Sequence, residues 1–204
     1  MNIISIPSPN FTPGRKIYSP IAVVIHIMEG TLTGTDSWFK NPLSKVSAHY
    51  GIGKNGEVHQ YVKETDTAWH AGRVNAPSWQ LIKQAPNGLF VNPNYYTIGI
   101  EHEGNESSEW TEAMYASSSE MIRSICTRWS IPIDRNHVIG HHEIYSLKTC
   151  PGFKLDINKL IALATNTPIP LIPSNGIEKV QEAGNVTTKT SLNIRSQPNT
   201  NKPP

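Results

Sequence analysis

One run of the sequence, residues 21–27 (IAVVIHI), constrains the fold more strongly than any other segment. All of its residues except the histidine are apolar and most are β-branched, which is typical of a strand buried on both faces of a sheet. Such a strand needs a covering layer on each side, so we expect an α/β domain. His26 lies near the end of this run, where an imidazole ring is costly to bury without a polar partner.

The other periodic segments predict a mixed central β-sheet flanked by helices. We expect strands at residues 46–51, 57–62, 97–101 and 136–140, and helices at residues 36–40, 111–129 and 156–164. Asn55-Gly56 is a strong signal for a hairpin between the first two of these strands. Asp36 and Asp156 are expected to cap the first and the last helix.

A long segment, residues 73–94, contains several prolines and has no sustained hydrophobic period. We expect it to form an irregular surface segment with one short helical turn near residues 79–83. Long ordered loops of this kind often border a binding groove.

The composition argues against nucleic-acid-binding and membrane-spanning proteins. The formal net charge is only +2 at pH 7 and no block of Lys and Arg occurs, so no nucleic-acid partner is expected. No stretch of about 18 apolar residues predicts a membrane span. The first residues also lack the charged and apolar regions of a signal peptide. We therefore expect a chain without membrane span or signal peptide that acts as a monomer.

Two histidines and a cysteine have the chemistry of a catalytic zinc site. Such a site has three protein ligands of the His, Cys or carboxylate type and leaves a fourth position open. His26 ends one predicted strand, His141 follows another, and Cys150 comes nine residues later in a loop. Neighbouring strand ends and a connecting loop predict a zinc site in a surface groove. A disulfide between Cys126 and Cys150 is the alternative, which the expected burial of Cys126 on a helix disfavours.

Five motifs occur in the order and spacing of a known family: IAVVIHIMEG, VSAHYGIGKNGEVHQYV, TAWHAG, NYYTIGIEHEG and GHHEIYSLKTCPG. They resemble the zinc amidases that include phage endolysins, muropeptide-recycling amidases and animal peptidoglycan recognition proteins. The resemblance covers about residues 15–162. It implies zinc-dependent hydrolysis of the amide bond between N-acetylmuramic acid and L-alanine, with Zn²⁺ as cofactor and peptidoglycan or muropeptides as partner.

The resemblance also assigns the metal ligands. It carries the first two ligand positions to His26 and His141, with His142 as the competing choice for the second. The third position falls on Cys150, where other members have Asp. A thiolate binds zinc strongly and donates more charge to it than a carboxylate does.

Two further residues match catalytic positions of the family. Glu101 is expected to be the general base, because an attacking water needs a nearby carboxylate to take its proton. Glu103, two residues further on, is expected at the rim. Lys148 is expected to stabilise the oxyanion of the tetrahedral intermediate. Some relatives have a catalytic Tyr where this chain has Ala48, so Glu101 is expected to carry more of the proton transfer.

Other motif residues are expected to line or shape the substrate groove: His49, His70 and Asn94. For His49, a hydrogen bond within the sheet is an equally good hypothesis. Three aromatic residues either stack on sugar rings or pack into the core, and the sequence alone does not separate these roles: Trp69, Trp79 and Tyr95.

Three domain segments are expected. The catalytic domain covers residues 1–165, a proline-rich linker covers 166–185, and a short terminal segment covers 186–204. The terminal segment contains LNIRSQPN, which resembles the opening strand and turn of a bacterial Src-homology-3-like wall-binding module. A segment this short cannot bury a core of its own, so we expect an incomplete module or a disordered tail.

Hydrolysis of wall peptidoglycan, in lysis, autolysis or wall turnover, is the leading functional hypothesis. One alternative is a cytosolic recycling amidase that acts on soluble anhydro-muropeptides. Another is a non-catalytic peptidoglycan-binding protein, against which the retention of all the metal and catalytic positions argues. The lack of a visible signal peptide fits cytoplasmic recycling and phage-type release equally, so it does not locate the protein.

Overall fold

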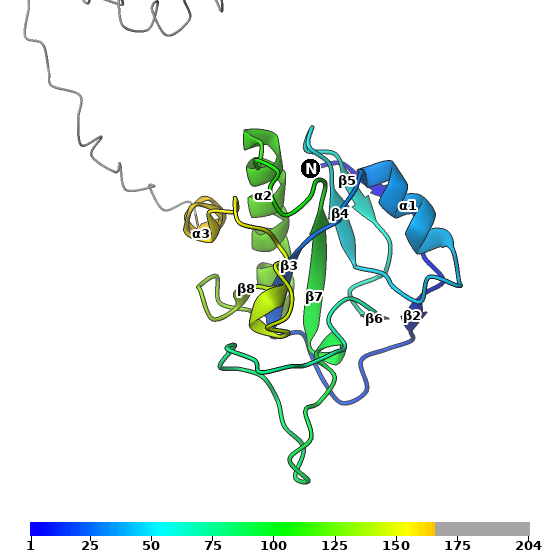
Figure 1. Cartoon of the computed structure of the whole chain (residues 1–204), viewed down its shortest axis with the longest axis vertical. Coiled ribbons are helices and arrows are strands. Elements are labelled where there is room, and N and C mark those ends of the chain that lie inside the picture. The colour runs from blue at the N-terminus through cyan, green and yellow to red at the C-terminus, as the bar shows by residue number, and fades with distance from the viewer. Residues whose placement is uncertain (166–204) are drawn as a thin grey trace, which may run out of the picture. The chain divides into compact units, whose positions relative to one another are not determined.

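The apolar run at residues 21–27 forms strand β3 (Ala22–Ile27), which lies between β7 and β8 in a six-stranded sheet. This arrangement is seen in a computed structural model that describes residues 1–165 of the chain (Figure 1). Every residue of β3 is buried, as the sequence predicts.

The sheet is mixed, with the strand order β1-β5-β4-β7-β3-β8. Its other strands are β1 (Ile3–Ser5), β4 (Tyr50–Ile52), β5 (Val58–Gln60), β7 (Thr97–His102) and β8 (Val138–Gly140). Strands β4 and β5 pair antiparallel across the Asn55-Gly56 turn, and the other pairs are parallel. The predicted mixed sheet and hairpin are confirmed; β4, β5 and β8 are shorter than expected, and β7 is one residue longer.

The two faces of β3 are buried by different parts of the chain. Val23 and Ile25 belong to a core formed with helices α2 (Glu112–Trp129) and α3 (Ile157–Thr165). Ala22 and Val24 belong to a second core, which includes Trp79 from the irregular segment. Because side chains alternate along a strand, His26 points to the same face as Ala22 and Val24. The face that carries His26 is therefore the one opposite α2 and α3, and on that face His26 shares a cavity with Trp38 and Phe39 of helix α1 (Leu32–Lys40).

Helices α2 and α3 begin where the sequence predicts. The side chain of Thr111 caps α2 by accepting a hydrogen bond from the backbone N–H of Met114. Asp156 accepts one from the backbone N–H of Lys159 at the start of α3. Both caps satisfy amide groups that lack a partner in the first helical turn.

The prediction for the first helix is wrong at its start. Helix α1 (Leu32–Lys40) begins earlier and is capped by Thr31, whose hydroxyl accepts from the backbone N–H of Gly34. Asp36 lies inside the helix, and its carboxylate accepts hydrogen bonds from Tyr61 and pairs with His59. A tertiary contact therefore uses the side chain that the sequence suggests as a cap.

Several short features were not expected from the sequence. Strand β1 pairs parallel with β5, and β2 (Phe11–Thr12) and β6 (Thr67–Ala68) form a separate two-stranded sheet. By contrast, the single turn expected near residues 79–83 is present, and in it the backbone N–H of Ile82 donates to the carbonyl oxygen of Trp79. In the part of the chain that the structure describes, no helix is long and apolar enough to cross a membrane.

The predicted linker (166–185) and terminal segment (186–204) lie outside the described residues.

Candidate metal centre

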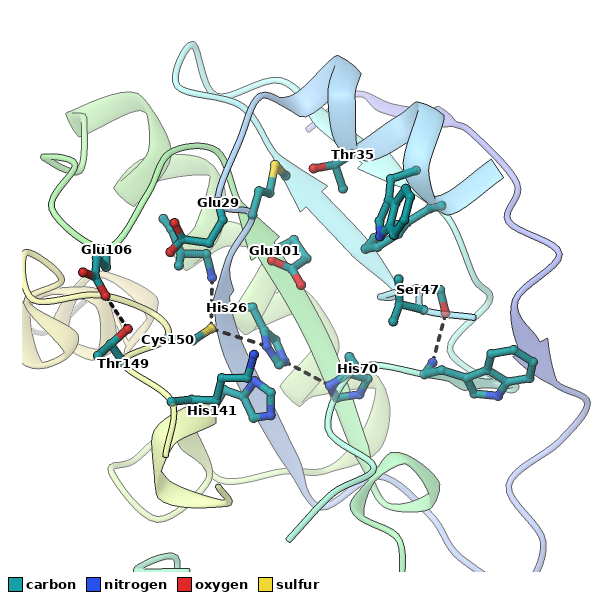
Figure 2. A pocket seen from close by; sticks show the side chains of 17 residues that line it. His26, Glu29, Thr35, Ser47, His70, Glu101, Glu106, His141, Thr149 and Cys150 are labelled. Atoms are coloured by element: carbon teal, nitrogen blue, oxygen red, sulfur yellow. Dashed lines mark hydrogen bonds between the residues drawn. The ribbon is translucent and has the colours of Figure 1, made fainter. Parts of the chain in front are cut away.

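Three side chains converge at the carboxyl edge of the sheet: His26, His141 and Cys150. Each offers one donor atom, and these atoms all lie within 4.8 Å of one another. The Sγ atom of Cys150 is 3.7 Å from Nδ1 of His26 and accepts a hydrogen bond from the backbone N–H of Ile27 (Figure 2). Among residues 1–165, this is the group of His, Cys and acidic side chains spaced to hold a metal ion.

Parallel strands bring the first two of these side chains together. His26 is the second-last residue of β3, and Ile25 is the register partner of Gly140 at the end of β8. His141 follows directly in a short 3-10 helix, η2 (His141–Glu143). Because the carboxyl ends of parallel strands meet at one edge, residues far apart in sequence become neighbours. The His26 and His141 rings lie with their centroids 4.6 Å apart.

The loop that carries Cys150 is tied back to the same helix. The backbone N–H of His142 and its ring Nδ1 both lie 3.0 Å from the carbonyl oxygen of Cys150. His142 is exposed and its ring is engaged with this backbone carbonyl, while His141 points into the donor cluster. This geometry favours His141 over His142 as the second ligand.

Burial keeps the three donors uncharged in the chain on its own. It lowers the pKa of His26 well below its ordinary value and lowers that of His141 to about 4, with Lys148 nearby adding to both effects. Burial raises the pKa of the Cys150 thiol, and the charge of Glu101 raises it further. A divalent cation would reverse the thiol's preference, because a metal stabilises the thiolate.

Glu101 presents an unpartnered carboxylate oxygen beside this cluster. It is the register partner of His26 on β7, and both side chains line a cavity of about 400 Å³. Its Oε2 atom is buried and has no hydrogen-bond partner among the described residues. Burial raises the pKa of Glu101 to about 8, an effect that Lys148 opposes and Glu29 reinforces. Glu103 instead accepts a hydrogen bond from the backbone N–H of Lys54, away from the donors.

Lys148 stands between two adjoining cavities. The first contains the donor cluster and Glu101, and the second, of about 540 Å³, extends past Arg73 and Tyr145. Both are lined by the side chains of Trp69, His70, His141 and Lys148. The two cavities therefore form one groove that runs past the donor cluster on both sides.

The three predicted groove residues lie at different depths. His70 lines both cavities, and Asn94 lines the second while its Oδ1 accepts from the backbone N–H groups of His70 and Ala71. His49 is fully buried, and its two ring nitrogens lie within hydrogen-bonding distance of Arg15 and the backbone N–H of Gly99. His49 therefore supports the groove from below, as the hydrogen-bonding hypothesis expected, and does not reach its surface.

The aromatic residues also separate into two groups. Trp79 is buried in the second core, where its ring stacks on Tyr96, and Tyr95 stacks on Tyr18. Trp69 lines the groove, as does Trp38 on α1, which the sequence motifs do not indicate. Trp38 is 55% exposed and is therefore available to a ligand.

The disulfide alternative is wrong, because both cysteines are free. Cys126 lies on the buried face of α2, and burial raises the pKa of its thiol to about 12. It therefore behaves as a small apolar side chain.

Arg15, in an irregular segment, was missed by the sequence arguments. Its buried guanidinium donates to the carbonyl oxygens of Asn94 and Thr97 beneath the groove.

The sequence and the fold have counterparts among known proteins. A family model described as N-acetylmuramoyl-L-alanine amidase matches residues 17–153. N-acetylmuramoyl-L-alanine amidase A of Achromobacter lyticus is 42% identical over 110 residues, which are 52% of this chain and 51% of that protein. The chain thus spans about half the length of this relative.

Two further matches cover more of the chain. The 1,6-anhydro-N-acetylmuramyl-L-alanine amidase AmpD of Citrobacter freundii is 29% identical over 179 residues, covering 78% of this chain and 89% of that protein. The solved structure of a selenomethionine derivative of AmpD superposes with a TM-score of 0.63 at 28% identity, covering 79% of this chain and 93% of the other.

Proposed function

The chain belongs to the N-acetylmuramoyl-L-alanine amidase family, and from that premise we propose that it hydrolyses the amide bond between N-acetylmuramic acid and L-alanine in peptidoglycan. The observation that carries the proposal is the convergence of His26, His141 and Cys150 beside the unpartnered carboxylate of Glu101 in one groove. A binding protein has no need of a buried carboxylate without a partner, because such a group is costly to desolvate.

The donor set fits Zn²⁺. Two imidazole nitrogens and one thiolate sulfur are ligands that zinc prefers, and three protein ligands leave the open position typical of catalytic sites. When bound, zinc supplies Lewis-acid activation of the water and of the amide carbonyl. The orphaned Oε2 of Glu101 supports the same assignment, since a cation or a water held at the donors would give this oxygen a partner.

We assign the proton transfers to Glu101. Its carboxylate takes a proton from the attacking water and later returns it to the departing amine of L-alanine. The burial that raises its pKa to about 8 favours the second of these steps. Lys148, and the positive charge that a metal ion adds, favour the ionised carboxylate that the first step needs. Position 48 is a fully buried alanine, and its methyl side chain offers no second proton donor.

We assign the oxyanion to Lys148. Its side chain is exposed at the junction of the two cavities, on the loop that also carries Cys150. An ammonium group placed there stabilises negative charge that develops on the carbonyl oxygen during attack. The groove extends on both sides of this point, which suits a substrate with a glycan on one side of the scissile bond and a peptide on the other.

A second candidate substrate is a soluble anhydro-muropeptide. The similarity to AmpD of Citrobacter freundii, a 1,6-anhydro-N-acetylmuramyl-L-alanine amidase by name, favours it. Both substrates contain the same scissile amide, so the metal site does not distinguish between them.

The test uses the purified full chain on intact sacculi and, separately, on soluble anhydro-muropeptides. Mass spectrometry should find new L-alanine amino termini and an intact lactyl group on muramic acid, and a strong chelator should abolish their release. Release from one substrate only would identify the physiological class. Binding of sacculi without any new terminus would refute hydrolysis and leave a peptidoglycan-binding protein.

A further inference from the structure

We infer that His70 is a positioning residue that selects which ring nitrogen of His26 faces the metal site. This inference rests on the proposed function, because it concerns a donor atom of the metal centre. It gives His70 a role that does not depend on contact with substrate.

The two histidine rings meet at right angles beside the donor cluster. Nδ1 of His70 lies 3.0 Å from Nε2 of His26, and the ring centroids are 5.1 Å apart (Figure 2). The other nitrogen of His26, Nδ1, faces Sγ of Cys150 at 3.7 Å. A neutral imidazole has one N–H and one lone pair. If Nε2 of His26 carries the proton, Nδ1 offers a metal its lone pair. If Nε2 accepts a proton from His70 instead, Nδ1 carries the N–H and cannot bind a metal.

Thr97 determines the direction of that hydrogen bond. Its hydroxyl donates to the carbonyl oxygen of Pro93 at 2.8 Å, which uses the only proton that the hydroxyl has. Toward Nε2 of His70, 3.4 Å away, the same oxygen is an acceptor. His70 is therefore protonated on Nε2 and accepts through Nδ1.

The consequence reaches the metal site in one further step. Because Nδ1 of His70 accepts, Nε2 of His26 must carry the proton in their 3.0 Å contact. Nδ1 of His26 then presents a lone pair toward Cys150, which is the form that binds a cation. The chain of hydrogen bonds from Pro93 through Thr97 and His70 prepares His26 before any metal arrives.

The sequence leaves a space in which the His70 ring is held. On β7, a Cβ atom built at Gly99 would come within 2.6 Å of Cγ and Nδ1 of His70, so the ring lies directly on this glycine. The backbone N–H of His70 donates to Oδ1 of Asn94 at 3.2 Å. A glycine beneath the ring and a hydrogen bond at its backbone hold His70 in reach of His26.

The first test measures zinc affinity by chelator competition, without substrate. His70→Phe keeps a ring but removes the acceptor, and we expect zinc to bind about 10- to 100-fold more weakly, the usual effect of losing such a partner. His70→Asn places a carbonyl oxygen near the position of Nδ1 and should retain most of the affinity. Equal affinity of wild type and His70→Phe would overturn the inference.

Glycine variants provide a matched pair. Gly99→Ala should displace the His70 ring and weaken zinc binding, although residue 99 touches no metal donor. Gly30→Ala is the control, because a Cβ there meets nothing closer than 4.0 Å. Equal zinc affinities for the two variants would contradict the packing step of the argument.

A measurement on the wild-type chain avoids any folding defect of the variants. Two-bond ¹H–¹⁵N correlation spectra of the metal-free protein should report His26 as the Nε2–H tautomer, and His70→Phe should abolish this preference. An Nδ1–H tautomer of His26 in wild type would overturn the inference. If the wild type binds no zinc, the proposed function fails, and the tautomer result still decides the role of His70.

Discussion

Two buried histidine clusters on the same sheet have pKa values shifted in opposite directions. At the carboxyl edge, His26 lies among other histidines and a thiol, and burial lowers its pKa well below the ordinary value. On β5, His59 is 4% exposed but lies between two carboxylates, 2.8 Å from Asp36 and 2.7 Å from Glu57. Burial lowers the pKa of His59, but the hydrogen bonds to these carboxylates outweigh it and raise the pKa overall.

The difference shows that partners, more than burial, decide what a histidine does. Both ring nitrogens of His59 are bonded to carboxylates, and the bond to Asp36 ties helix α1 to the sheet, since Asp36 also accepts from Tyr61. The edge cluster consists of His26, His70, His141 and Cys150. In the described structure no carboxylate is bonded to its imidazole rings, so ring nitrogen lone pairs are available to a metal ion. A histidine can bind a metal only if one ring nitrogen keeps a free lone pair, and His59 has both ring nitrogens bonded to carboxylates.

The largest expected effect comes from removing a donor of the edge cluster. Cys150→Ser should lose stoichiometric zinc and nearly all hydrolysis, because a hydroxyl is a much weaker zinc ligand than a thiolate. Metal analysis and product release measure the two effects. Cys126→Ala is the matched control and should keep both zinc and activity, since Cys126 lies in the core. Equal losses from the two variants would argue against Cys150 as a ligand.

Glu101→Gln should leave the donors intact and remove only the proton acceptor. Turnover is expected to fall by about 100- to 10,000-fold, the usual contribution of a positioned general base. Zinc stoichiometry and substrate binding should stay close to wild type, which distinguishes this variant from Cys150→Ser. Wild-type turnover in a zinc-loaded Glu101→Gln protein would exclude Glu101 as the base.

The two clusters were not equally visible in the sequence. His26 and Glu101 end apolar runs, and parallel pairing brings such residues to one edge, so strand patterns alone suggest that they meet. Asp36 was expected to cap α1, because helix-capping propensity is local and says nothing of His59 on another element. Arg15 had no signal at all, since its partners are backbone carbonyls that only the folded chain assembles.

The clusters should have opposite effects on stability as pH changes. His59 has a folded-state pKa above the unfolded value of about 6.5, so its stabilisation is full below that pH and is lost as pH rises through the folded pKa. His26, with a lowered pKa, makes the metal-free protein less stable as pH falls below about 6.5. Near His59 the folded state binds more protons than the unfolded state, whereas near His26 the unfolded state binds more.

Chemical denaturation of the metal-free wild type and of His59→Gln from pH 5.5 to 9 measures the contribution of His59 to the free energy of unfolding. The variant should be less stable by about 1.5–3 kcal/mol at the acidic end, as for hydrogen bonds to charged groups. The difference should shrink toward alkaline pH, where the wild type loses the same proton. A difference that grows with pH would mean that His59 is neutral in the folded protein.

The smallest expected effect is the difference in stability contributed by the two carboxylates that bond to His59, those of Asp36 and Glu57. The Glu57 side chain is 42% exposed and that of Asp36 is 14% exposed, so water screens the first pair far more than the second. Exposed ion pairs contribute about 0–1 kcal/mol, and we expect Glu57→Gln to cost an amount in that range. Asp36→Asn, which also weakens the bond from Tyr61, should cost more and should weaken the pH dependence due to His59 more strongly. If denaturation at pH 6 instead finds Glu57→Gln the more damaging change, the exposed carboxylate holds the imidazolium, and helix α1 is not attached to the sheet through this histidine.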